Sequence, residues 1–204
     1  AKGELKGAEN FLLKQLQNNP LPKIEQKKVL IDFLINKPDS TLEVVNNILF
    51  DLVPLDPAFN DFMELKSIIT KYYSENEVDQ KAFTHFIQSE IFIRQNKLGN
   101  SIEELQYIKN ELKESKIVSL VNLRLSLLFY RLKSYENALE LAQSLQDTDL
   151  ADKGIILTGQ IYELKLSKPE KALDYYMKIL DEFPKSIFSE PIRYHIREMQ
   201  IIKS

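Results

Sequence analysis

The sequence contains no cysteine, no tryptophan and only five glycines among its 204 residues. Without cysteine the chain can form no disulfide and offers no thiolate for catalysis or metal binding, which leaves the cellular compartment open. The few glycines form no Gly-rich loop of the kind that cradles phosphate groups. No apolar run approaches the roughly 20 residues that a membrane-spanning helix requires. We therefore expect no transmembrane segment in this chain.

The sequence also has few histidines and no net positive charge. The two histidines, His85 and His195, cannot supply the three or four clustered ligands of a zinc site, and we expect both to have packing roles. The formal net charge is −3, so no general basic field attracts nucleic acid. The sequence therefore predicts no catalytic centre, no metal site, no cofactor and no nucleic-acid partner.

Apolar residues recur at intervals of three and four, which is the helical period. No segment alternates for long enough to predict a strand convincingly. In the N-terminal half the pattern predicts helices over residues 23–36, 41–53, 57–73 and 78–95. Asp39 or Ser40 is predicted to cap the second of these. The polar stretch 111–116 is predicted to be a loop.

The most informative segment carries a small residue, an aromatic residue, a second small and a second aromatic residue, and then proline. These are Gly159, Tyr162, Ala172, Tyr176 and Pro184. We expect Gly159 and Ala172 to face each other and to let two antiparallel helices approach closely, with the two tyrosines filling the space beside them. Such a helix pair leaves an apolar side uncovered, so neighbouring pairs must stack on it.

The same pattern recurs upstream. Ala138 lies 34 residues before Ala172, and Ser101 lies 37 residues before Ala138. The extra residues fall in the predicted loop 111–116, and one more falls beside Lys168, between the two helices of the last repeat unit. The remaining small and aromatic or apolar positions of the two earlier units are Ser89, Phe92, Leu105, Ser126, Phe129 and Ala142.

This order of residues resembles the tetratricopeptide repeat (TPR) signature, W-x-x-L-G-x-x-Y, A-x-x-x-F and P. Ile155 and Thr158 stand at its Trp and Leu positions. The resemblance implies an all-α fold, a right-handed α-solenoid of stacked antiparallel helix pairs. It implies a single solenoid over 1–204, with degenerate helical repeats over 1–78, three clearer TPR units over 79–184 and a C-terminal capping helix over 185–204.

The two ends of the chain carry further expectations. Ala8, Leu12 and Pro20 have the spacing of a second TPR helix, which predicts that the chain begins inside a repeat. The final helix, over residues 189–202, is expected to cover the preceding helix pair with an apolar row. That row consists of Ile192, Ile196, Met199 and Ile202.

Two narrower resemblances bear on origin. Residues 59–69 and 82–104 are similar to uncharacterised TPR proteins common in Bacteroidetes, with Gln95, Asn96 and Lys97 retained and Ser89 replacing the usual alanine. Residues 180–197 resemble the ends of bacterial envelope TPR proteins. This resemblance favours the periplasm or cell envelope over the cytoplasm.

The TPR resemblance also implies which side chains line a concave binding face. They are Phe86, Glu90, Arg94, Leu127, Tyr130, Arg131, Gln160 and Glu163. The expected function is a non-catalytic scaffold, monomeric or weakly dimeric, that binds an acidic or amphipathic peptide or helix of a partner protein. The alternative is an accessory or regulatory region of a larger enzyme or transport complex. The alternative for Arg94 and Arg131 is that they only solvate the ends of their helices and bind no partner.

Overall fold

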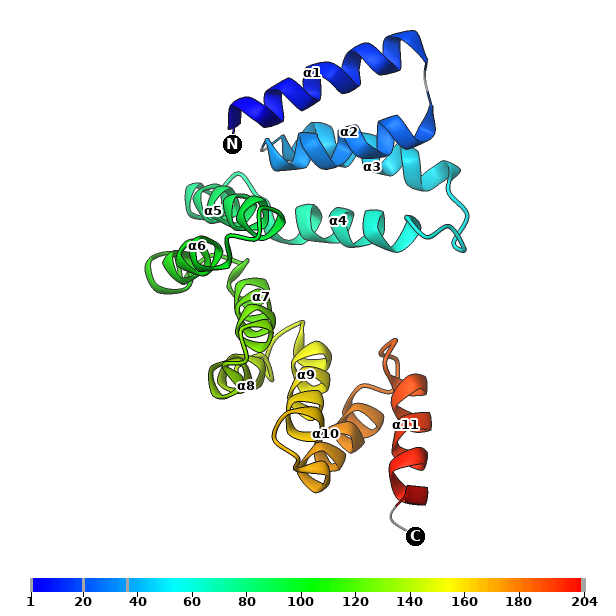
Figure 1. Ribbon diagram of the computed structural model, residues 1–204, viewed down its shortest axis with the longest axis vertical. Coiled ribbons are helices and arrows are strands. Elements are labelled where there is room, and N and C mark those ends of the chain that lie inside the picture. The colour runs from blue at the N-terminus through cyan, green and yellow to red at the C-terminus, as the bar shows by residue number, and fades with distance from the viewer. Residues whose placement is uncertain (1, 20, 36, 203–204) are drawn as a thin grey trace. The chain divides into compact units, whose positions relative to one another are not determined.

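The computed structural model describes residues 2–19, 21–35 and 37–202. The regular secondary structure of these residues is entirely helical, and no strand occurs among them (Figure 1). The helices are α1 (Lys2–Asn18), α2 (Pro22–Leu34), α3 (Pro38–Asp51), α4 (Phe59–Tyr72), α5 (Glu77–Arg94), α6 (Leu98–Glu111), α7 (Val118–Arg131), α8 (Tyr135–Gln143), α9 (Ala151–Leu164), α10 (Pro169–Glu182) and α11 (Ser189–Ile202). The predicted all-α fold is confirmed.

The helices group into two compact units, residues 1–117 with α1 to α6 and residues 118–204 with α7 to α11. Within the first unit α1 packs on α2, α3 on α4 and α5 on α6; within the second, α7 packs on α8 and α9 on α10. Helices adjacent in sequence therefore pair, an arrangement compatible with a helical repeat. The boundary between the two units follows Ile117.

The four helices predicted in the N-terminal half are present, each within about two residues of its expected ends except at the start of α3. That helix begins at Pro38, and neither Asp39 nor Ser40 caps it, so the predicted N-cap is wrong. Proline suits the first helical position because its fixed φ is already helical and it has no N–H to satisfy. The Thr41 hydroxyl donates a 2.6 Å hydrogen bond back to the Lys37 carbonyl.

Small residues set how closely the paired helices approach. The Ser126 hydroxyl of α7 donates a buried 2.6 Å hydrogen bond to the Ala138 carbonyl of α8. In the next pair a Cβ placed on Gly159 of α9 would overlap the ring of Tyr176 of α10. Gly159 thus lies against Tyr176, and Ala172, one turn before Tyr176 on α10, is fully buried. The ring fills the space that the missing side chain leaves.

A second close approach, not predicted from the sequence, joins α8 to α9. A Cβ on Gly154 would lie 2.6 Å from the Ala142 carbonyl oxygen and 2.8 Å from the Leu145 Cβ. Real Cβ contacts of this length are essentially absent from proteins. Gly154 is therefore required for α9 to pack at its present distance from α8.

A residue with left-handed backbone conformation follows the first helix of three successive pairs. Asn96, Lys133 and Ser167 adopt φ values of 57°, 62° and 51°, in the left-handed region. After α7 the N–H of Lys133 donates to the Tyr130 carbonyl three residues before it, and the next N–H donates five residues back. These two bonds define a Schellman C-cap, and the turn at Asn96 repeats them.

The third turn contains one more residue than the other two. The N–H of Lys168 donates to the carbonyl of Tyr162, six residues back rather than five. The one-residue insertion that the sequence predicts beside Lys168 therefore enlarges this turn without disturbing either helix.

Helix α11 covers the α9–α10 pair, as predicted. Ile192 and Ile196 are 8% and 5% exposed, and Met199 packs against the same core. The buried residues of that core are Ile155, Ile156, Ala172, Tyr176, Ile179, Ile192 and Ile196. The side chain of Ile202, the fourth member of the predicted row, lies outside the described residues.

We expect Gly154→Ala and Gly159→Ala each to lower the free energy of unfolding by ~1–3 kcal/mol, because the added methyl group overpacks a helix contact. Urea denaturation followed by circular dichroism measures the change. Gly99→Ala is the matched control, since no atom lies within 4 Å of its added Cβ and alanine is the better helix former by up to ~1 kcal/mol. Equal behaviour of all three variants would contradict the close approaches.

We expect Lys133→Gly to raise the free energy of unfolding by up to ~1 kcal/mol, because glycine adopts a positive φ without the steric strain of a Cβ. The matched control is Lys178→Gly, in the interior of α10, which should lower it by ~1 kcal/mol. The same denaturation experiment compares them. Destabilisation of similar size by both substitutions would argue against a left-handed residue at position 133.

Candidate functional site

The predicted binding residues lie on three helices. Phe86, Glu90 and Arg94 are on α5 of the first unit, whereas α7 and α9 of the second unit carry the others. The two groups are described separately below. Their exposure divides them into residues that a partner could reach and residues that belong to the core.

Of the three predicted binding residues on α5, only Arg94 is exposed. Phe86 is fully buried, with its ring centroid 6.4 Å from that of Phe83, so its side chain is a core element and is closed to a partner. Glu90 is 8% exposed and accepts a 2.9 Å hydrogen bond from Arg94 Nη1, which also donates to the Glu90 carbonyl at 3.0 Å. The Arg94 side chain nevertheless remains 47% exposed.

On α7 the predicted residues form one exposed strip. Leu127, Tyr130 and Arg131 are spaced three and four residues apart, and Leu127 is 40% exposed. The Tyr130 ring packs edge-on against Tyr135, with 5.8 Å between ring centroids. Lys165 Nζ lies 5.2 Å from the Tyr130 ring centroid, so the C-terminal ends of α7 and α9 lie together.

The two predicted residues on α9 differ in their surroundings. Gln160 is exposed, as is Leu164 one turn later, at 60%. Glu163 points instead into the protein, where its Oε2 accepts a 2.8 Å hydrogen bond from the Tyr176 hydroxyl and lies 2.9 Å from His195 Nε2. Glu163 therefore links α9 to α10 and α11.

The surroundings of Glu163 explain two further features. Burial, and secondarily the hydrogen bond to Glu163, raise the pKa of Tyr176 far above its usual value, so its hydroxyl remains a donor. The His195 ring packs edge-on against Tyr176, with centroids 5.4 Å apart. His195 thus has the packing role that the sequence predicts, and Glu163 is occupied by internal contacts.

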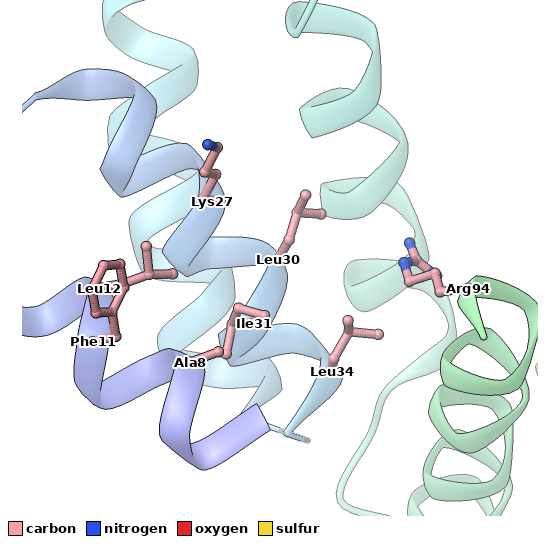
Figure 2. A pocket seen from close by; sticks show the side chains of 8 residues that line it. All are labelled: Ala8, Phe11, Leu12, Lys27, Leu30, Ile31, Leu34 and Arg94. Atoms are coloured by element: carbon pink, nitrogen blue, oxygen red, sulfur yellow. The ribbon is translucent and has the colours of Figure 1, made fainter. Parts of the chain in front are cut away.

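One surface that the sequence did not predict is an apolar groove of about 380 Å³ in the first unit, shown in Figure 2. Its lining consists of Ala8, Phe11, Leu12, Lys27, Leu30, Ile31, Leu34 and Arg94. The α2 residues among these follow the spacing i, i+3, i+4, i+7. In the sequence, this spacing indicates that the residues share one face of the helix. Periodicity alone does not show whether that face is exposed or covered by another helix.

Asp79 fixes the start of α5 to the turn that follows α6. Its carboxylate accepts hydrogen bonds from the Ser74 hydroxyl at 2.7 Å, the Ser115 hydroxyl at 2.8 Å and the Lys116 N–H at 3.0 Å. Burial by itself raises the pKa of Asp79, but these three hydrogen bonds and the charge of Lys116 lower it below its usual value. The ionised carboxylate therefore stabilises the folded state.

Within the described part of the chain, no group of three or more His, Cys, Asp or Glu side chains could hold a metal ion. Among those same residues, no helix has both the length and the apolar character needed to cross a membrane. Comparison with models of known protein families and with curated protein sequences found no match to this chain.

We expect Asp79→Asn to lower the free energy of unfolding at pH 7 by ~1–3 kcal/mol, because buried donors lose a charged acceptor. The folded pKa lies below the unfolded value of about 3.9, so this contribution is complete above about pH 5 and declines as pH falls through the folded pKa. Urea denaturation at pH 7, 5 and 3 should show the difference from wild type shrinking at pH 3. Asp147→Asn, at an exposed position, is the control. If Asp79→Asn lowered the free energy of unfolding no more than this control does, the stabilising role of Asp79 would be contradicted.

Proposed function

We propose that this chain is a non-catalytic protein–protein interaction scaffold of the TPR type, built as a right-handed α-solenoid. The observation that carries the proposal is the recurrence of a left-handed residue after α5, α7 and α9, in register with the small and aromatic residues of the TPR-like pattern. TPR hairpins present the faces of their first helices to partner segments, and α5, α7 and α9 are the first helices of these pairs.

The proposed binding surface is the exposed strip of α7 and α9, which we call the α7–α9 surface. It consists of Leu127, Tyr130, Arg131, Gln160, Leu164 and Lys165. Leu127 and Leu164 offer exposed apolar area, at 40% and 60%. Tyrosine and arginine are enriched among residues that dominate binding energy.

The chemistry of this surface supports a particular kind of partner. Apolar residues spaced along two helices suit the apolar face of an amphipathic peptide or helix. Arg131 and Lys165 add positive charge beside that apolar area, which favours a segment with acidic residues. The envelope-type ending over residues 180–197 is the ground for proposing a bacterial cell-envelope assembly as the setting.

We expect Tyr130→Ala/Arg131→Ala to reduce recovery of a partner in crosslinked co-purification from the native organism, because it truncates two side chains of hot-spot type. Loss of one such anchor costs at least about 2 kcal/mol of binding. Circular dichroism of the purified variant verifies that it remains folded.

The matched control is Tyr194→Ala/Arg197→Ala on α11. Tyr194 is 63% exposed and Arg197 lies 5.9 Å from its ring centroid, so the control removes the same side-chain types from another surface of the same unit. A partner recovered equally with wild type and both variants would show that the α7–α9 surface does not bind it.

A further inference from the structure

The groove of the first unit exposes apolar side chains that the chain's own packing does not use. Phe11 on α1 is 61% exposed and Leu30 on α2 is 42% exposed. Both belong to the lining of the groove, so the exposed area is continuous rather than scattered. Isolated exposed apolar residues need no explanation, but a contiguous apolar patch marks an interaction site.

The shape of the groove fits a third helix. One wall is the face of α2 that carries Leu30, Ile31 and Leu34, and the other is the face of α1 that carries Ala8, Phe11 and Leu12, as Figure 2 shows. Two paired helices leave a valley between them into which the side chains of another helix can pack. Docking of an amphipathic helix in such a groove is a recurrent mode of protein recognition.

The charged side chains that line the groove are basic. Among its lining residues that the structure describes, only Lys27 and Arg94 are charged. Figure 2 shows Lys27 at one end of the α2 row, whereas Arg94 projects from α5, across from Leu34.

Both Lys27 and Arg94 can bind a carboxylate of a partner. Lys27 forms no ion pair with any residue that the structure describes. Arg94 uses only Nη1 for Glu90, so among the described residues Nε and Nη2 stay open for a carboxylate in the two-point geometry that guanidinium groups favour.

We propose that this groove binds an amphipathic helix of a partner protein whose apolar stripe is flanked by two carboxylates. The apolar stripe would cover Phe11, Leu30 and Ile31, and the carboxylates would pair with Lys27 and Arg94. This inference names a second surface on helices other than α7 and α9. It therefore stands or falls separately from the α7–α9 surface.

A displayed library of helical peptides tests the proposal on the full chain. Each peptide is about 18 residues long, enough for marginal helicity, with apolar residues fixed at i, i+3, i+4 and i+7 and the flanking positions randomised. We expect selected peptides to carry Asp or Glu on both flanks of the stripe. Replacing these acids by Gln or Asn should weaken binding, measured by fluorescence anisotropy, at least about tenfold, a factor of ten being ~1.4 kcal/mol.

Charge reversal identifies the protein side of each pair. Lys27→Glu/Arg94→Glu should weaken binding of the acidic peptides at least about tenfold. The same variant should bind peptides with Lys in place of the acids more tightly, because the attraction is then restored with opposite sign. Lys113→Glu, at an exposed position outside the groove, is the matched control and should leave binding unchanged. Phe11→Ser/Leu30→Ser should abolish binding of both peptide sets, with circular dichroism verifying the fold.

Three results would overturn the proposal. Peptides that bind equally with and without acidic flanks would show an apolar groove without charge selection. Dimerisation of the chain in light scattering, lost in Phe11→Ser/Leu30→Ser, would identify a second copy as the occupant. A library that selects nothing against wild type beyond what Phe11→Ser/Leu30→Ser selects would show that the groove binds no helix, and the α7–α9 surface would remain to be judged by its own experiment.

Discussion

The close approach of helices at small residues is the constraint on which the second unit depends. A helix pair buries its apolar stripe only when the two backbones come near enough for side chains to interdigitate. Gly154 permits this between α8 and α9, and Gly159 permits it between α9 and the ring of Tyr176. Because the Tyr176 ring fills the space beside Gly159, its hydroxyl reaches Glu163, which in turn meets His195 of α11. The attachment of the last helix therefore follows from the absence of a side chain at residue 159.

Backbone turns provide a second constraint that agrees with the first. Asn96, Lys133 and Ser167 are separated by 37 and 34 residues, the same spacings that separate Ser101, Ala138 and Ala172. The turns and the small residues belong to different parts of each helix pair, so a shared spacing means that whole pairs recur. The left-handed conformation costs a residue with a Cβ ~1–2 kcal/mol, and it is adopted here by Asn, Lys and Ser. The packing of each pair evidently outweighs that cost.

The sequence predicted the helices well because their apolar period is strong, and it predicted α11 because Ile192, Ile196 and Met199 share one face. The sequence-based prediction failed where packing against a neighbouring helix decides whether a residue is buried or critical. Gly154 is critical only because the Ala142 carbonyl lies beside it, and that neighbour is not visible in local spacing. Phe86 was placed on a binding face by its position in the repeat, yet it is fully buried. Periodicity assigns a residue to a face of its helix, but what covers that face depends on tertiary packing.

The same distinction separates the two surfaces from the core. Glu163 and Leu164 are adjacent on α9, yet Glu163 is satisfied by Tyr176 and His195 whereas Leu164 is 60% exposed. On α5, Glu90 is likewise 8% exposed while Arg94, one turn later, lines the apolar groove. Glu163 joins α9 to α10 and α11, whereas Glu90 accepts a hydrogen bond from Arg94 of its own helix. In both cases a residue shortly after the carboxylate reaches solvent. Side chains that hold the fold and side chains available to a partner thus occur within one turn of each other, which is why neither surface follows from sequence position alone.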